Sequence, residues 1–293
     1  MTTTDKGSLS RLEKIDRRAI YLVIFIVVTV PLLWPIGLPL SIGEHVRALY
    51  DFIDDLEPGS IIVLSWDVDA ATKPEWYPQG AAIIYHVAHK KEAKVVTLAL
   101  RVDGAIFADE ALREIFNIPE NMPTDEHPDY GVRFINLGYV AGGQAAVTTM
   151  ATDLNSLVKI DHYGNSLEDL RLAKDLVGLK DAALVIALST GAHIWMWWEF
   201  LHVPYGTPLG VGGTGALTAA VAPLYPSDLV GYLGGLRGAA EYEYLVMRPG
   251  SAIAAMDAQL LAHLVIVIFV VLGNFTYFLR RITRGEDERR CKI

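Results

Sequence analysis

Cysteine is almost absent from this chain: its 293 residues include one, Cys291, close to the C-terminal end. A single thiol cannot form a disulfide within the chain, which excludes the small secreted domains that disulfides hold together. Positive charge is also scarce, with 25 Lys and Arg against 34 Asp and Glu and a formal net charge of −9. Because binding to nucleic acid requires Lys and Arg to replace counterions, this balance argues against a nucleic-acid partner.

Charged residues are missing from two long apolar runs. Residues 19–40 and 258–279 are each 22 residues long and contain no Asp, Glu, Lys or Arg. At a rise of about 1.5 Å per residue, a helix of that length crosses the roughly 30 Å of hydrocarbon in a bilayer. We therefore expect transmembrane helices at 19–40 and, with its lead-in, at 251–279, and a lipid bilayer as a partner.

The first run has an alternative interpretation and one irregularity. Ser41 and Gly43 are small residues at a possible signal-peptide cleavage site. However, the run exceeds the roughly 7 to 15 apolar residues of such a peptide. Pro31, Pro35 and Pro39 are spaced by four and would kink or end a helix. The sequence favours an uncleaved span with an irregular outer end.

The scarcity of Lys and Arg between the runs predicts the orientation. The tails 1–18 and 280–293 contain eleven such residues, whereas the twenty residues on the inner side of each run contain one each. Because Lys and Arg beside a span are retained in the cytoplasm, both tails should be cytoplasmic and the acidic body extracytoplasmic. Cys291 would then lie in the cytoplasm, and the exported body would have no thiol.

The body alternates between two kinds of segment. Residues 41–58 have the pattern of an amphipathic connecting helix, followed by a domain at 59–250. Short runs of mainly β-branched and aliphatic residues are typical of strands covered on both faces; they are residues 61–65, 95–100, 132–137 and 184–188. Helical spacing follows at 79–91, 108–116, 144–157 and 166–177. This order predicts a Rossmann-like three-layer sandwich with a mostly parallel sheet.

The last part of the domain is rich in glycine. The secondary structure of residues 209–212 is uncertain from the sequence. Residues 227–247 have the length of one long helix. In that helix Gly231, Gly235 and Ala239 would recur every four residues on one face, which permits close approach of another helix. Internal packing is the default interpretation, and contact with a second copy or another membrane protein is the alternative.

The fold predicts where a ligand would bind. In open parallel sheets ligands bind beyond the carboxyl ends of the strands, where the strand order reverses. The residues after the predicted strands form a candidate rim, which comprises Trp66, Asp67, Asp69, Arg101, Asp103, 138–144, Ser189, Thr190, Gly191, His193 and 210–215. Backbone N–H groups and hydroxyls at such junctions suit a phosphate or carboxylate. The ligand-binding residues we select are Gly142, Gly143, Gln144, Ser189, Thr190, Gly191, His193, Gly212, Gly213 and Thr214.

Two aspartates follow the first predicted strand in the segment IIVLSWDVDAATKPEW. Asp67 and Asp69 have the spacing to share Mg²⁺, or to act as nucleophile and general acid. The pair resembles the first motif of haloacid-dehalogenase-like hydrolases, over about ten residues, which implies a Mg²⁺-dependent hydrolase. The segment departs from that motif at Ala71, where Thr or Val is usual, and no later acidic pair completes a metal site. Helix capping and loop solvation are the alternative roles.

The glycine run GVGGTG at 210–215 matches the spacing G-x-G-x-x-G of dinucleotide-binding turns. The preceding VPYGTPL is a poor strand, and no acid lies about 20 residues further on to bind a ribose. A plain glycine-rich turn is therefore favoured, and the identity of any cofactor stays open.

The sequence leads to three functional hypotheses. The first is a membrane-anchored protein whose Rossmann-like domain binds a small anionic ligand or a partner protein without catalysis. The second is a Mg²⁺-dependent hydrolase that uses Asp67 and Asp69. The third is a structural subunit of a membrane assembly. No metal site is complete enough to be assigned.

Overall fold

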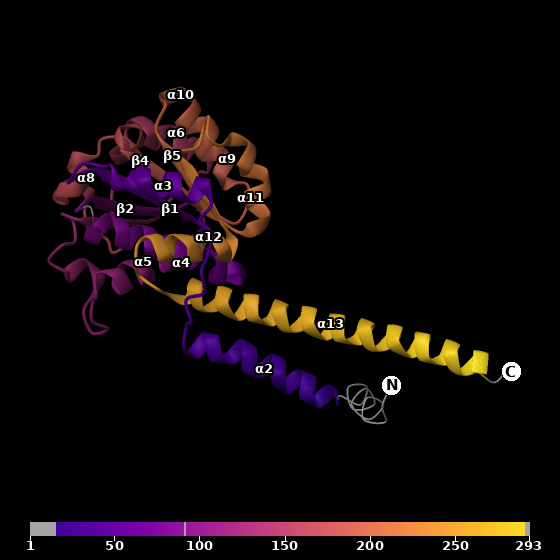
Figure 1. Ribbon diagram of the computed structural model, residues 1–293. Coiled ribbons are helices and arrows are strands. Elements are labelled where there is room, and N and C mark those ends of the chain that lie inside the picture. The colour runs from indigo at the N-terminus through magenta and orange to yellow at the C-terminus, as the bar shows by residue number, and fades with distance from the viewer. Residues whose placement is uncertain (1–15, 91, 291–293) are drawn as a thin grey trace. The chain divides into compact units, whose positions relative to one another are not determined.

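The computed structural model describes residues 16–90 and 92–290. One compact unit, Pro39–Ile253, contains the sheet and the helices around it (Figure 1). The other unit combines the two ends of the chain, from Leu38 back and from Ala254 onward. Most of the predicted tail 1–18, and Cys291 in the tail 280–293, lie outside the described residues.

A six-stranded sheet forms the centre of the α/β unit. All of its strand pairs are parallel, in the order β3-β2-β1-β4-β5-β6. The strands are β1 (Ile61–Asp67), β2 (Lys94–Ala99), β3 (Phe134–Tyr139), β4 (Leu184–Ser189), β5 (Leu209–Gly213) and β6 (Gly231–Gly234). Successive residues of β1, β2 and β4 are buried on both faces, as in a sheet that helices cover on both sides. The predicted α/β class and parallel sheet are confirmed, and this strand order is consistent with a Rossmann-like fold.

Helices cover both faces of the sheet (Figure 1). One face is covered by α4 (Lys73–Tyr85), α5 (Val102–Ile115) and α12 (Gly235–Leu245), and the other by α6 (Gln144–Thr152) and α9 (His193–Trp197). The shorter helical segments are η1 (Ala70–Thr72), η2 (His86–Lys90), η3 (Thr124–Glu126), α7 (Leu154–Leu157), η4 (Leu167–Asp169), α8 (Arg171–Asp175), η5 (Leu179–Asp181), η6 (Trp198–His202), α10 (Val203–Tyr205), α11 (Gly215–Val221) and η7 (Ala222–Leu224).

Two predicted helices are interrupted. The segment 144–157 forms α6 and α7, because Asp153 is extended and its Oδ1 accepts the N–H of Ser156 at 2.9 Å, which starts a new helix. In the segment 166–177 only α8 and the turn η4 are helical.

The prediction of one helix over 227–247 is wrong. Gly231 begins strand β6, and Gly235, with a φ of +57°, begins α12 directly after the strand. A Cβ at Gly231 would lie 2.4 Å from the carbonyl oxygen of His45, so glycine there reflects close packing inside the unit. Gly231, Gly235 and Ala239 are all buried; Gly235 and Ala239 are one turn apart in α12, whereas Gly231 lies in β6. They provide no surface for a second copy or another membrane protein.

The predicted connecting segment 41–58 contains α3 (Glu44–Asp54), which packs as part of the α/β unit. Val46, Leu49 and Ile53 form its buried stripe. A Cβ at Gly210 of β5 would lie 2.9 Å from Cδ1 of Leu49, so the glycines of β5 and β6 leave the room that α3 occupies.

The second unit contains two apolar helices, α2 (Arg17–Leu33) and α13 (Ser251–Arg290). Within the described residues, one stretch is long and apolar enough to cross a membrane, Ser251–Phe278. The 17 residues of α2 measure about 26 Å, less than the roughly 30 Å of hydrocarbon. The predicted span 19–40 is therefore not one continuous helix. It ends at Leu33 because Trp34, which precedes Pro35, is extended.

A buried carboxylate replaces the missing helical hydrogen bonds after α2. Asp257 of α13 accepts the backbone N–H groups of Ile36 and Gly37 at 2.8 Å and of Leu38 at 2.9 Å. These amides follow the end of α2, so the carboxylate supplies acceptors that a continuing helix would have provided. Asp257 thus joins the two chain segments of this unit.

A buried amide joins α4 to the glycine-rich strands. Gln79 is fully buried, and its Nε2 lies 2.9 Å from the carbonyl oxygens of Glu75, Gly213 and Gly235. Its Oε1 accepts the N–H of Gly213 at 2.7 Å. Every polar atom of this side chain is therefore engaged in holding α4, β5 and α12 together.

Replacing Gln79 with Leu should destabilise the protein by about 3 kcal/mol, or roughly 6 to 12 °C in Tm, because buried backbone groups lose their partners. Thermal unfolding of the full chain in detergent, followed by near-UV circular dichroism, measures this. The matched control is Gln144→Leu at an exposed position, which should change stability by less than about 0.5 kcal/mol. Equal Tm values for the two variants would contradict the role assigned to Gln79.

Candidate functional site

The strand order reverses between β1 and β4. These strands are neighbours in the sheet, with Asp67 opposite Ser189 at their carboxyl ends. The chain continues from β1 to β2 on one side and from β4 to β5 on the other. Such a switch point leaves a crevice beyond the strand ends, and ligands of open α/β sheets bind there.

Asp67 lies beneath this crevice with no exposed surface. One carboxylate oxygen accepts the N–H of Leu100 after β2, and the other accepts Nε1–H of Trp197 in α9, both at 2.7 Å. Burial raises the pKa of Asp67, although these two donors oppose the shift. A buried carboxylate engaged at both oxygens is unsuited to bind Mg²⁺ or to attack a substrate, so the geometry assigns Asp67 a structural role.

Asp69 caps the turn that follows β1. Its Oδ1 accepts the N–H of Ala71 at 3.1 Å, and its Oδ2 accepts the hydroxyl of Thr190 at 2.8 Å. The hydrogen bond from Thr190 is the main reason that the pKa of Asp69 is lowered. Asp69 therefore ties the loop after β1 to the loop after β4, which matches the capping alternative. In the described parts of the chain, no three His, Cys, Asp or Glu side chains gather as metal ligands.

The predicted residues after β4 form a compact turn. The Ser189 hydroxyl is buried, donates to the carbonyl of Gly191 at 3.1 Å and accepts the N–H of the same residue at 3.2 Å. Thr190 donates its N–H to the carbonyl of Asp67 and its hydroxyl to Asp69. These groups fix the shape of the turn, and His193 at the start of α9 extends toward the next cleft.

Residues 210–213 of the glycine run are buried, whereas Thr214 is half-buried and Gly215 is exposed. The N–H of Gly213 donates to Gln79 and that of Gly215 donates to the Glu75 carboxylate at 2.9 Å. A Cβ at Gly213 would lie 2.1 Å from the carbonyl oxygen of Ser189, so close packing requires glycine there. Gly212 and Gly213 are buried and pack against the neighbouring strands, so this part of the run serves the contact between β5 and its neighbours.

The residues after β3 remain on the surface. Gly142 and Gly143 have φ values of +120° and +52°, and the chain enters α6 at Gln144. Gly142 and Gln144 are exposed, and a Cβ at Gly143 would lie 3.9 Å from Sδ of Met196 in α9. None of the three lines the cleft described next.

A cleft of about 380 Å³ opens at the carboxyl edge of the sheet. It is lined by Leu100, Arg101, Val102, Asp103, Tyr139 and His193. Arg101 is half-buried, and its Nε donates to the carbonyl of Val68 at 3.1 Å. Among the described residues, its two terminal nitrogens have no hydrogen-bond partner, so these donors are available to a ligand. Asp103 is exposed at the rim and is the one acid among the lining residues.

A second cleft, of about 540 Å³, lies on the other side of Tyr139. Its walls are the end of β3 and residues 157–162, which contribute Lys159 and His162 as exposed cationic or ionisable groups. Asp161 also borders it but is buried and accepts hydrogen bonds from Tyr130, Tyr163 and Asn165. The second cleft thus adds the exposed ammonium group of Lys159 next to the first.

The structure brings together only part of the predicted site. Of the ten selected ligand residues, His193 alone lines the first cleft. Arg101 and Tyr139 belong to the wider rim predicted from the strand ends, and the cleft depends on them. Lys159 was missed because it lies within the long connection from β3 to β4 and not directly after a strand.

Comparison with known proteins gives no match to a family model, to a curated protein or to a solved structure. The interpretation of the site therefore depends on its geometry.

The stability that Asp69 contributes should depend on pH. A carboxylate whose pKa is lowered by folding stabilises the protein above its ordinary value of 3.8, and this contribution disappears as pH falls through the lowered pKa. The difference in Tm between the wild type and Asp69→Asn should therefore be constant above about pH 5 and shrink below pH 4. A difference that stays the same or grows on acidification would show that Asp69 is not stabilised as a carboxylate.

Proposed function

We propose that this protein is anchored in a membrane and that its Rossmann-like unit binds a small anion, with a phosphate or carboxylate group, in the cleft of Arg101, Tyr139 and His193. The role is binding and not catalysis. The body lies on the extracytoplasmic side of the membrane, and both ends of the chain lie in the cytoplasm.

The observation that carries this proposal is the position of Arg101. Its backbone follows Leu100, whose amide is held by Asp67, and its Nε is held by the carbonyl of Val68. The guanidinium is therefore fixed at the carboxyl edge with its terminal nitrogens unoccupied. A planar, permanently charged group with several donors matches a carboxylate or phosphate. His193, which also lines the cleft, adds a second nitrogen-containing side chain.

Anchoring is supported by the two apolar helices and by the charges beside them. The stretch Ser251–Phe278 has the length of a span. The helix α2 exposes large apolar side chains such as Tyr21, Phe25 and Ile26 along its length. We propose that α2 and the residues after it form a second, partly irregular span, since 19–40 contains no charge. The Lys and Arg of the two tails set the orientation.

The hydrolase hypothesis has less support. It requires an accessible aspartate pair, whereas Asp67 is buried and Asp69 caps a turn. The assembly hypothesis loses its proposed contact, because the glycines at 231 and 235 are interior. Ligand binding is the hypothesis for which the structure offers accessible donors.

Inorganic phosphate, sulfate or a small carboxylate should raise the Tm of the full-length protein in detergent, because a ligand that binds the native state stabilises it. Replacing Arg101 with Gln should weaken that binding by about tenfold or more, since hydrogen bonds to a charged group contribute about 1.5 to 3 kcal/mol. Isothermal titration calorimetry gives the two dissociation constants.

The control for this experiment is Arg171→Gln, which removes an exposed arginine of α8 outside the cleft. It should bind the anion as the wild type does. The proposal is wrong if no anion of the series stabilises the wild type, or if the two Arg variants lose binding equally.

A further inference from the structure

The segment between α12 and α13 exposes apolar side chains where the chain leaves the sheet. Tyr244, at the end of α12, is 56% exposed, and Met247 is 78% exposed. A cleft of about 460 Å³ opens beside them. It is lined by Glu243, Tyr244, Leu245, Met247, Pro249 and Ile253. Apolar side chains that are exposed next to one another in this way are available for contact with another apolar body.

Few charges lie in this part of the chain. From Tyr244 to Asp257 the charged residues are Arg248 and Asp257. Arg248 is paired, because its Nη2 lies 2.7 Å from Oε1 of Glu114. Asp257 accepts three backbone amides of its own unit. No unpaired charge of this segment would therefore have to leave water if the apolar surface were covered.

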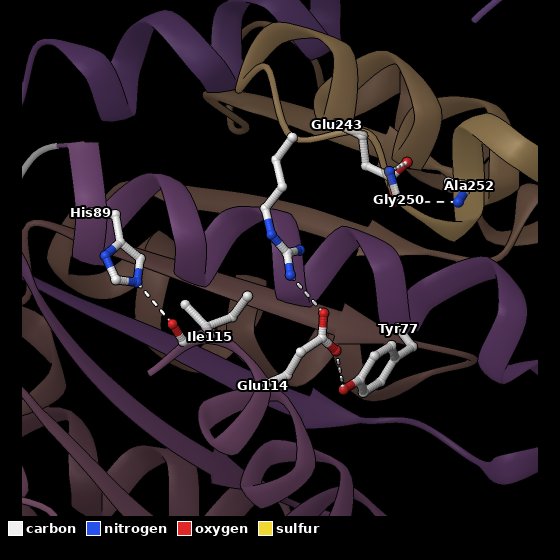
Figure 2. A network of polar contacts seen from close by, with 8 residues as sticks. Tyr77, His89, Glu114, Ile115, Glu243, Gly250 and Ala252 are labelled. Carbon is white, nitrogen blue, oxygen red and sulfur yellow. Dashed lines mark hydrogen bonds and ion pairs between the residues drawn. The ribbon is translucent and has the colours of Figure 1, made fainter. Parts of the chain in front are cut away.

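Hydrogen bonds hold the segment in one shape (Figure 2). The Glu243 carboxylate is buried and accepts the N–H groups of Gly250 at 3.0 Å, Ala252 at 3.2 Å and Ile253 at 2.9 Å. These amides belong to the start of α13, where a helix needs partners for its first N–H groups. A Cβ at Gly250 would lie 2.4 Å from Oε1 of Glu243, so the contact needs glycine.

The same segment is fixed from the side of α4 and α5. Glu114 near the end of α5 accepts the hydroxyl of Tyr77 at 2.9 Å as well as Arg248 (Figure 2). The guanidinium of Arg248 also lies 5.3 Å from the centre of the Tyr85 ring. Hydrogen bonds and the ion pair therefore tie residues 243–253 to the rest of the α/β unit.

We infer that the surface of Tyr244, Met247 and Pro249 docks onto the headgroup layer of the bilayer that α13 crosses. This inference rests on the anchoring part of the proposed function. Met247 lies four residues before Ser251, at most about 14 Å along the chain from the start of the apolar stretch. A headgroup layer is roughly 5 to 8 Å deep on each side of the hydrocarbon. Tyrosine prefers this layer, since its ring is apolar and its hydroxyl is polar.

Docking in this way would direct the anion cleft away from the membrane. The helix α12 starts at the carboxyl end of β6 and returns antiparallel to the strands, so its last residue lies toward their amino ends. Arg101 and Tyr139 lie at the opposite, carboxyl ends, and a six-residue strand is about 20 Å long. The ligand would thus enter from the aqueous side.

Spin labels attached to single cysteines test this contact. The Cys291→Ser variant removes the native thiol, and labels are then placed at Met247→Cys, at Val102→Cys and at Phe275→Cys in separate proteins. Each full-length protein is reconstituted into phosphatidylcholine vesicles. Electron paramagnetic resonance power saturation compares collisions with oxygen, which enters lipid, and with a water-soluble nickel chelate. Val102 is 64% exposed at the carboxyl edge and Phe275 is 56% exposed on α13, so all three positions accept a label.

The label at Met247 should favour oxygen over the nickel chelate severalfold more than the label at Val102, and less than the label at Phe275. A label at Tyr244→Cys serves as a second probe of the docked surface and should behave like that at Met247. The inference is wrong if Met247 and Tyr244 both give the aqueous ratio of Val102 while Phe275 gives the lipid ratio. If Phe275 also gives the aqueous ratio, the anchoring itself is wrong, and binding of anions in detergent remains a separate question.

Discussion

The buried carboxylate of Asp67 is the interaction on which the shape of the candidate site depends. One of its oxygens holds the amide of Leu100 and the other holds the indole of Trp197. Leu100 precedes Arg101, and Trp197 ends the helix that begins at His193. The two walls of the first cleft are therefore fastened to the same side chain. Burial of a carboxylate in this position is costly, and two short hydrogen bonds offset part of that cost.

The polar groups of the α/β unit divide between its two ends. At the carboxyl ends of the strands, Asp67 and Asp69 fix the loops, and Arg101 remains available. Toward the amino ends, the Glu243 carboxylate accepts hydrogen bonds from the backbone amides at the start of α13. In the proposal, the carboxyl ends of the strands present charge to the solvent. The opposite side of the unit has its carboxylate buried and presents apolar side chains to the lipid.

The sequence predicts the central strands because most of their positions are apolar, and this property arises from their burial on both faces. It fails at β6 and α12, since a strand of four residues that includes glycines at both ends carries no such signal. Small residues at every fourth position are compatible with one face of a helix and also with close packing around a strand. Only the close approach of Gly231 to the backbone of His45 distinguishes these two interpretations. The end of α2 was foreseen in part, because three prolines stand there.

The candidate site was predictable in position but not in composition. The predicted strand ends located the correct edge of the sheet, and the rim derived from them included Arg101. The selection of glycine and hydroxyl residues as ligands, in contrast, chose groups that form hydrogen bonds or close contacts within the fold. Whether the N–H of Gly213 is free depends on Gln79, which is 134 positions away in the sequence. Likewise, the pairing of Asp67 with Trp197 spans 130 positions and cannot be read from the Asp-x-Asp spacing.

The structural role of Asp67 can be measured directly at the indole of Trp197. Proton–nitrogen NMR of the six tryptophan indoles gives a small set of signals, and Trp197→Phe identifies the relevant one. The account predicts that this proton resonates downfield and exchanges slowly in the wild type, and that Asp67→Asn shifts it upfield and weakens its protection. An indole signal that exchanges rapidly and does not respond to Asp67→Asn would contradict the account.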